Sequence, residues 1–516
     1  MGQARGNPGR RARQGGWMGG LRRAWLAVLL AILGLATTAV RAEAALTVYF
    51  DTSAYAGNVW LQVQDPNYAS TTTNFQATYA GGTAINFVQS GSNVLMSVPV
   101  PLSAIGSGGL TITYSQSAVL FLFYDDPTAN SRTAAPAYPT STQRFQPFEL
   151  TMTGGSGDQG NLTAINYFTA PLSIKSYAVN PATTPSAPVL QQTGFGSYTA
   201  AQLGAQFRTA TGGAAAATVT NATGGIVRYL GPSSFTSSNP WPSFLPYLQS
   251  INAASQATTI QRTNGFNFAA PQNTPVYQFG ANMTATVGSD GTITTTGSIT
   301  ATANTAVASG NPPLPSGGAW TGATMTFSAS DMTALNNLIY GQSQNSAVSF
   351  TGSAWSDFQT FTQNTLMYPG QAHNVTTNPS LYDLGAYSTT VAMFIGEVTT
   401  GLLGGFFNSN YVPSGQSTAI KNMASNSWWS LNPIVGYATI QPSNQYYNVY
   451  AGIIFNASGN TVYGVPYSDR FGSGPLVNTV YYNGSNVGYW TVGVGAPLGA
   501  ATTPVGSLTL QLLSAS

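Results

Sequence analysis

The 516-residue chain contains no cysteine, a single histidine and few charged residues. Asp, Glu, Lys and Arg make up 5% of the sequence, whereas an average soluble domain carries about 25%. Disulfides and thiolate metal ligands are therefore excluded, and one imidazole, His373, cannot build a zinc site of the usual Cys and His type. The hydrophobic share of 43%, with 27 Tyr, 24 Phe and nine Trp, excludes charge-driven disorder and indicates a large folded core.

The few charges are unevenly distributed along the chain. Residues 1–44 hold seven Arg and one acid, which leaves eight basic and twelve acidic side chains for the other 472 residues. Phosphate binding needs clusters of Lys and Arg, and the later chain has neither clusters nor an excess of them. We therefore do not expect nucleic acid as a partner.

The amino-terminal segment has the pattern of a secretory signal peptide. An uncharged, Leu- and Ala-rich run at 24–40 follows a basic leader and ends at Ala42-Glu43-Ala44, a small-x-small cleavage pattern. The pair Arg22-Arg23 is also found before twin-arginine export signals. The alternative is a membrane anchor, for which 17 apolar residues are at the short limit. We predict a signal peptide at 1–44, a secreted or cell-surface protein, and no stable membrane partner after cleavage.

The mature chain is predicted to be mainly β, with a mixed α/β part between two β regions. In residues 45–180, short β-type runs alternate with Gly, Ser, Asn and Pro clusters, which favours a β-sandwich or barrel. These runs lie at 46–50, 59–63, 75–79, 94–100, 110–114, 119–124, 148–152 and 172–177.

The region 181–445 combines Ala, Thr and Gly tracts with helical patterns. Helices are predicted at 243–254, after Ser330 or Asp331, and at 391–403, and a hairpin is predicted to join 280–288 to 292–302. Strands return in 446–516, at 449–455, 462–465, 477–482 and 487–494, and are expected to complete the β domain or the wall of a groove between the two parts.

Glu149 is one of only two Glu residues after position 44. In Phe148-Glu149-Leu150-Thr151-Met152, strand alternation places Glu149 and Thr151 on the face opposite the three apolar residues. The polar run from Asp158 to Phe168 follows closely. Its amides, hydroxyls and aromatic rings suit a sugar, although an ordinary turn followed by a strand would have the same composition.

These segments resemble glycoside hydrolase family 64, the secreted β-1,3-glucanases of the thaumatin-like superfamily. Residues 148–172 are similar to its Glu-x-Thr strand and the turn that follows, and 444–469, with Tyr463-Gly464-Val465-Pro466-Tyr467-Ser468-Asp469, is similar to its Tyr-Gly-Phe-x-Tyr-Asp-Asp run. A weaker similarity covers 241–250. The resemblance implies a thaumatin-like β domain with an inserted α/β domain and a groove between them.

The resemblance also implies an inverting glycosidase that needs no metal or organic cofactor and acts on a β-1,3-glucan polysaccharide or oligosaccharide. Glu149 matches the general acid, but Asn166 occupies the position of the general base, and a neutral amide cannot take a proton. Asp158 and Asp469 are the substitute bases to consider. The implied sugar- or water-binding residues are Thr151, Asn161, Thr163, Asn166, Tyr167 and Tyr467.

Three functions remain open from the sequence. The first is an endo-type β-1,3-glucanase that uses a substitute base, and the second is a protein that binds β-glucan without cleaving it. The third is a structural or adhesion protein of the cell surface, for which a Thr-, Ser- and Asn-rich surface of low charge would be suitable. The ring pairs Trp428-Trp429 and Tyr446-Tyr447 are expected in the core rather than as sugar platforms.

Overall fold

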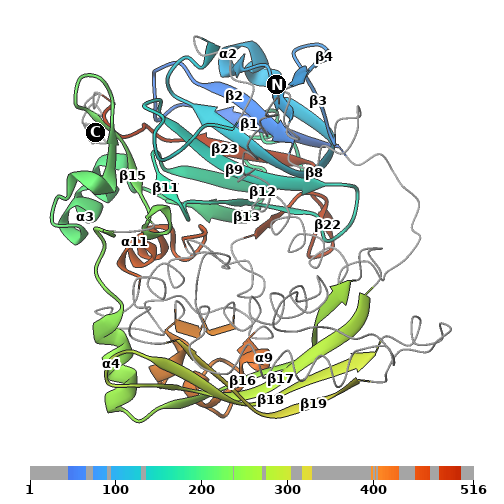
Figure 1. The fold of residues 1–516 in the computed structure, drawn as a ribbon. Helices are drawn as coiled ribbons and strands as arrows, with labels where there is room; N and C mark the ends of the chain where they lie inside the picture. The colour runs from blue at the N-terminus through green and yellow to red at the C-terminus, as the bar shows by residue number, and fades with distance from the viewer. Residues whose placement is uncertain are drawn as a thin grey trace, which may run out of the picture.

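The fold is that of a computed structural model (Figure 1). It describes residues 45–65, 74–89, 95–128, 135–235, 238–269, 275–303, 317–327, 397–398, 401–402, 405–428, 448–464 and 476–500. The predicted signal peptide lies outside these residues. Within them, no helix has the length and apolar character needed to cross a membrane.

The largest element is a 14-stranded sheet that folds over on itself through one long strand, β8 (Leu110–Phe123). The first half of β8 pairs with β1 and β3, and the second half pairs with β2 and β9. The two halves therefore belong to two facing layers of a β-sandwich. A register shift between Ser115 and Ala118, with Ser117 at a φ of 58°, marks the bend.

Each layer of the sandwich combines strands that are distant in the sequence. One layer contains β1 (Leu46–Asp51), β3 (Phe75–Tyr79), β4 (Thr83–Ala84), β12 (Leu172–Tyr177), β13 (Val189–Gly194) and β23 (Tyr489–Val494). The other contains β2 (Trp60–Asp65), β5 (Phe87–Gln89), β6 (Leu95–Ser97), β7 (Val100–Pro101), β9 (Phe145–Met152), β10 (Gln159–Leu162) and β20 (Leu476–Asn478). The carboxy-terminal strand β23 lies between β1 and β12, so the two ends of the described chain meet in one layer.

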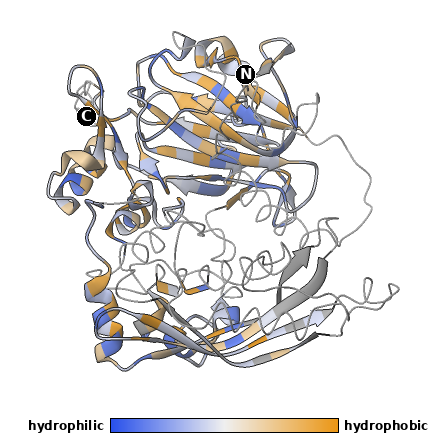
Figure 2. Ribbon diagram, viewed as in Figure 1, coloured by the Kyte–Doolittle hydropathy of each residue, from blue (hydrophilic) through white to orange (hydrophobic). Residues whose placement is uncertain are grey.

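Alternation of apolar and polar residues fixes which face of each strand is buried, as Figure 2 shows along the strands of the sandwich. In β9, Phe148, Leu150 and Met152 point into the core between the layers. Trp490 of β23 is fully buried in the same core and donates from Nε1 to the carbonyl of Asn478, 3.0 Å away. This hydrogen bond ties β23 to β20 in the other layer and helps to close the sandwich at that side.

A small sheet of β11 (Tyr167–Phe168), β15 (Ile226–Leu230) and β14 (Thr218–Thr220) lies at one end of the sandwich, beside two helices, α3 (Ala200–Ala210) and α11 (Val449–Ser458) (Figure 1). The two helices meet where the rings of Phe207 and Tyr450 stack, with centroids 5.1 Å apart. The remaining short elements of this part are α2 (Leu102–Ile105), η1 (Gly106–Gly108), η3 (Ala215–Ala217), η4 (Pro232–Ser234), β21 (Tyr481–Tyr482) and β22 (Ser485–Asn486).

A second sheet of four antiparallel strands lies below the sandwich in the view of Figure 1. Its strands are β16 (Ala257–Ala269), β17 (Pro275–Val287), β18 (Ile293–Ala303) and β19 (Gly317–Phe327). One face packs against α4 (Leu245–Ala253), α9 (Ser425–Trp428), η6 (Phe406–Asn408) and η7 (Ile420–Asn422) through an apolar core that includes Ile260, Met283 and Ile299.

The mainly β fold with a few helices confirms the predicted fold class. The predicted strands 75–79 and 172–177 coincide with β3 and β12, and the predicted helix at 243–254 contains α4. The predicted hairpin is formed by β17 and β18, with Gly291 at a φ of 83° in its turn. The helix expected after Ser330 lies outside the described residues, as does most of the helix expected at 391–403.

Three predictions about individual elements are wrong. No strand forms at 462–464 of the strand expected at 462–465, where Tyr463 makes an isolated bridge with Thr163. The runs 110–114 and 119–124 form one strand, because pairing with β9 continues on both sides of the bulge at the intervening serines. The segment 449–455 forms the helix α11 instead of a strand. Asn448 caps this helix by accepting from the Ala451 N–H at 3.1 Å, and Gly459 ends it in the left-handed region, at a φ of 59°.

Candidate functional site

Glu149 lies on the outer face of the sandwich layer that contains β9. It is half-buried and stands directly opposite Val119 of β8 on one side and Asn161 of β10 on the other. Its neighbours in sequence, Phe148 and Leu150, point into the core. The alternation predicted from the sequence therefore agrees with the structure, in which Glu149 lies on the face of β9 that points away from the core.

Asn161 is the polar residue that the sheet places beside this carboxylate. Directly opposed residues of antiparallel strands have Cβ atoms about 5 Å apart. The side-chain carbonyl oxygen of Asn161 is buried and accepts no hydrogen bond within the described chain. A buried acceptor without a donor costs free energy, so the strand pairing leaves an unsatisfied amide oxygen next to the Glu149 carboxylate.

Thr151, two residues along the same face of β9, is already in contact with the protein. Its Oγ1 accepts from the backbone N–H of Ser117 at 3.2 Å, and Thr479 donates to its carbonyl at 2.8 Å. The hydroxyl thereby fixes the bulge of β8 against β9. The Thr151 Oγ1 also lies 3.5 Å from the Ser117 Oγ, a contact in which either hydroxyl can donate.

Asp158 does not have the surroundings of a general base. The carboxylate, 8% exposed, accepts from the backbone N–H groups of Thr153, Gly154 and Gly155, at 2.8 Å for Gly154 and 3.1 Å for Gly155. It also accepts from the Thr153 hydroxyl at 3.0 Å. The carboxylate thus organises the turn between β9 and β10, and these donors occupy the lone pairs with which a base would take a proton. The assignment of Asp158 as substitute base is therefore corrected to a structural role.

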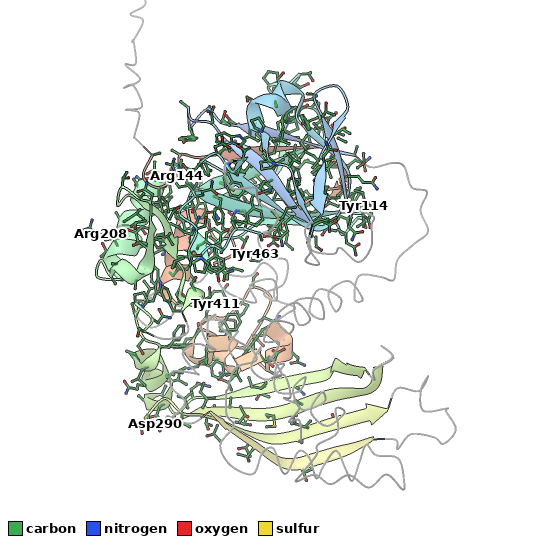
Figure 3. All side chains as sticks on the ribbon, turned by 45° about the horizontal axis from the view of Figure 1, so that its top comes forward. Tyr114, Arg144, Arg208, Asp290, Tyr411 and Tyr463 are labelled. Atoms are coloured by element: carbon green, nitrogen blue, oxygen red, sulfur yellow. The ribbon has the colours of Figure 1, made fainter. Side chains whose placement is uncertain are left out.

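The segment that follows β10 is held from several directions. Thr163 forms a parallel bridge with Tyr463, whose N–H donates to the Leu162 carbonyl at 3.0 Å and whose carbonyl accepts from Ala164 at 2.8 Å. In Figure 3, Tyr463 lies on the side of the sandwich that faces the four-stranded sheet. Thr163 therefore marks the end of the candidate site that points toward the second part of the molecule.

Asn166 is fixed by two serines of η4. The Ser233 hydroxyl donates to the Asn166 side-chain oxygen at 2.8 Å, and the Ser234 hydroxyl donates to the Asn166 carbonyl at 2.8 Å. The amide is thus anchored at its oxygen. It has no group that can accept a proton from water, which agrees with the sequence argument against Asn166 as a base.

Gln146 is a residue of the site that the sequence did not single out. It is buried, donates from Nε2 to the Thr163 carbonyl at 3.0 Å, and accepts from the Thr169 N–H at 2.9 Å. One side chain thus links β9 to both ends of the segment that carries Thr163 and Asn166. An isolated Gln in a strand gives no sequence signal for this role, because the role depends on which loop folds over the strand.

Tyr167 was expected to contact sugar, but its ring is buried with 7% of its surface exposed. Tyr138 stacks on it with centroids 5.1 Å apart, and Phe145 meets it edge-on at 5.4 Å. Burial raises the pKa of Tyr167, so the phenol stays neutral. The expectation of direct sugar contact is wrong for this residue, because the strand pairing of β11 with β15 turns its ring inward.

The remaining expected site residues, Tyr467 and Asp469, lie outside the described residues. Trp428 is 1% exposed and belongs to the core, as expected, while its neighbour Trp429 and the pair Tyr446-Tyr447 are outside the described part of the chain. Among the residues that the structure covers, no group of three or more His, Asp and Glu side chains is arranged to hold a metal ion.

The comparisons with known proteins give structural neighbours but no sequence relatives. No protein-family profile matches the chain, and no curated protein matches it. Two solved structures are similar over most of its length. The first is a laminaripentaose-producing β-1,3-glucanase in complex with laminaritetraose, at 15% identity and a TM-score of 0.46, covering 88% of this chain and 99% of the other. The second is a β-1,3-glucanase domain (GH64) from Clostridium beijerinckii, at 12% identity and a TM-score of 0.42, covering 89% and 100%.

Proposed function

We propose that this protein acts on β-1,3-glucan as an inverting glycoside hydrolase, with Glu149 as the general acid. The observation that carries the proposal is the row formed by Glu149 and Asn161 on the outer face of β9 and β10, where a half-buried carboxyl lies beside a buried amide oxygen that lacks a donor. A sugar whose glycosidic oxygen lies at the carboxyl would have the half-buried Asn161 side chain as its polar neighbour on the adjacent strand. The similarity of residues 148–172 to the family 64 signature supports the choice of substrate.

In this mechanism, protonated Glu149 gives its proton to the glycosidic oxygen as the C1–O bond breaks. A water molecule on the opposite face of the ring attacks C1 and loses a proton to a second carboxylate, so the configuration at C1 inverts. Thr151 and Asn161 would contact the sugar and orient it. Thr163 and Asn166 would position water or a neighbouring sugar unit.

We propose Asp469 as the second carboxylate. The carboxylate of Asp158 accepts hydrogen bonds from its own turn, and Asn166 is an amide. Asp469 is therefore the remaining candidate base among the residues that the resemblance to family 64 implies. The backbone of Tyr463 is hydrogen-bonded beside Thr163, and the chain that leads to Asp469 therefore starts at the candidate site. We further propose that residues 1–44 direct export of the protein, so that it meets its polysaccharide outside the cell.

A second candidate function is binding of β-glucan without cleavage. The specific observation in its favour is that Asp158 and Asn166, the two described residues considered at the position of the base, are engaged in hydrogen bonds to the protein. A site with an acid but no base would hold the polysaccharide and turn it over slowly, since loss of a general base costs roughly 10²- to 10⁴-fold in rate.

The test is to incubate the purified protein with linear β-1,3-glucan and to measure release of reducing ends, the anomeric form of the first product and binding of the polysaccharide. The hydrolase proposal predicts release of the α-anomer, abolished by Glu149→Gln and reduced at least a hundredfold by Asp469→Asn. Retained binding in both variants would show that the proteins are folded. Binding with no release by the unchanged protein would establish the second function, and absence of both would reject the two proposals together.

A further inference from the structure

The outer face of the layer that carries Glu149 also carries an aromatic cluster. Phe145 lies four residues before Glu149 on the same face of β9, and it packs against Phe121 and Phe123 of β8 at centroid distances of 6.0 and 5.4 Å. Four residues of an extended strand span about 13 Å. The cluster and the candidate acid are therefore neighbours along a single strand.

Tyr138 is one of the half-buried residues that pack against this cluster. Its ring is half-buried and lies nearly parallel to that of Tyr167, with an interplanar angle of 22° and a centroid distance of 5.1 Å. In this stack, Tyr167 covers one face of the Tyr138 ring. The two residues come from different segments, because Tyr138 precedes β9 and Tyr167 belongs to β11.

Arg228 of β15 holds this pair in place from within. The guanidinium group is buried and donates to three carbonyls of the segment before β9, those of Tyr138 and Ser141 at 2.8 Å and that of Gln143 at 2.5 Å. Its carbon lies 3.9 Å from the centroid of the Phe145 ring and 5.1 Å from that of Tyr167. The backbone of Tyr138 is thus fixed by a hydrogen bond, and its ring is fixed by the stack.

We propose that Tyr138 is an aromatic platform on which a neutral sugar ring stacks, as part of the same binding site as Glu149. The inference rests on the proposed function and deepens it by naming a residue for a sugar unit remote from the bond at Glu149. A ring held rigid before the ligand arrives loses little conformational entropy on binding, and sugars offer C–H faces that suit an aromatic surface.

Tyr167, on which the Tyr138 ring stacks, is itself buried. Burial is the main cause of the raised pKa of Tyr167, while Arg228 lowers that pKa and the charges of Tyr138 and Glu149 raise it further. Tyr167 contacts both Tyr138 and Phe145. It therefore supports the platform from the Phe145 end of β9, although its own ring is covered.

The separation along β9 gives the proposal a dependence on ligand length. A span of about 13 Å between Phe145 and Glu149 is longer than a single sugar ring. Tyr138 stacks on Tyr167, which packs against Phe145 at that end of β9, so the proposal assigns Tyr138 to a sugar unit beyond those that a disaccharide at Glu149 would fill. The platform should therefore contribute to the affinity for long ligands and have no effect on short ones.

The experiment measures binding of linear β-1,3-linked gluco-oligosaccharides of two to six units by calorimetry, in the Glu149→Gln background so that no ligand is consumed. Tyr138→Ala is expected to weaken hexasaccharide binding about tenfold and to leave disaccharide binding unchanged. Tyr138→Phe keeps the ring and should bind like the parent. The matched control is Tyr481→Ala, because Tyr481 is an exposed tyrosine of β21. The partner strand of β21 is β22, which lies across the sandwich from β11 in Figure 1.

The outcomes separate the platform from the proposed function. Hexasaccharide binding that Tyr138→Ala leaves intact would overturn the platform and leave β-1,3-glucan as the ligand. Equal weakening at every ligand length would also overturn it, because that pattern indicates a general loss of structure. Absence of binding by the parent at every length would overturn both proposals, and a loss confined to the longer ligands in Tyr138→Ala alone would support both.

Discussion

At the scale of single residues, the clearest result is that Asp158 serves the fold. Its carboxylate receives backbone hydrogen bonds from Thr153, Gly154 and Gly155. We expect Asp158→Asn to lower the free energy of unfolding by about 2 kcal/mol, because the amide lacks the charge and offers N–H groups where only acceptors fit. Denaturant unfolding measures the loss. Asp126→Asn, in an exposed turn capped at Thr128, is the control and should change stability little. Full stability of Asp158→Asn together with lost activity would instead restore Asp158 as a base.

Arg228 provides a second test at this scale, since it is a buried cation that satisfies three carbonyls. Arg228→Met keeps most of the volume but leaves those carbonyls without donors, so we expect a loss of about 3 kcal/mol in the free energy of unfolding. Arg208→Met, at the exposed end of α3, should cost less than about 1 kcal/mol. Equal effects of the two substitutions in denaturant unfolding would show that the guanidinium contacts do not stabilise the segment before β9.

At the scale of elements, α3 shows how local signals start a helix in a chain poor in charge. The Thr199 hydroxyl accepts from the Gln202 N–H at 3.2 Å, and the Gln202 side chain accepts from the Thr199 N–H at 2.9 Å. We expect Thr199→Ala to destabilise the protein by about 1 kcal/mol, because it removes this capping box. Thr209→Ala, exposed in the same helix, should be neutral or slightly stabilising, since Ala has the higher helix propensity. Thermal unfolding of both variants would contradict the role of the cap if Thr199→Ala had no effect.

The elements differ in how clearly the sequence indicates them. The strands β3 and β12 are predictable because alternation and turn residues agree at both of their ends. The Thr-x-x-Gln pattern at Thr199 could have predicted α3, whereas α11 could not be told from a strand by its pattern. Its residues are apolar on all sides and buried nearly throughout, so neither period is visible in the sequence.

The candidate site was predictable to the extent that it depends on one strand. Alternation along β9 placed Glu149 on the outer face, as the structure has it. The partners of Asp158 and the burial of Tyr167 depend on turns and on pairing with β15, which no periodicity encodes. Gln146 and Tyr138 depend on the same long-range contacts, and they therefore emerged from the structure alone.

At the scale of the whole molecule, hydrogen bonds and apolar packing take the place of charge. In the described part of the chain the salt bridge is that of Arg144 with Asp125, 2.5 Å apart and partly exposed. Buried polar side chains such as Gln146 and Arg228 donate to backbone carbonyls. Interactions of this kind are not screened by salt, whereas exposed ion pairs are.

We therefore expect the thermal midpoint to change by less than about 2 °C between 0.05 and 0.5 M NaCl, since charged residues make up 5% of the sequence and the ion pair in the described residues, partly exposed, contributes at most about 1 kcal/mol. Differential scanning calorimetry at several salt concentrations measures this. Arg144→Met removes the ion pair and should abolish whatever salt dependence remains, with little change in the midpoint itself. A thermal midpoint that falls steeply with added salt, in the parent and in Arg144→Met alike, would show that charges other than this pair stabilise the molecule. The reason is that added salt lowers the midpoint by screening attractive interactions between charges.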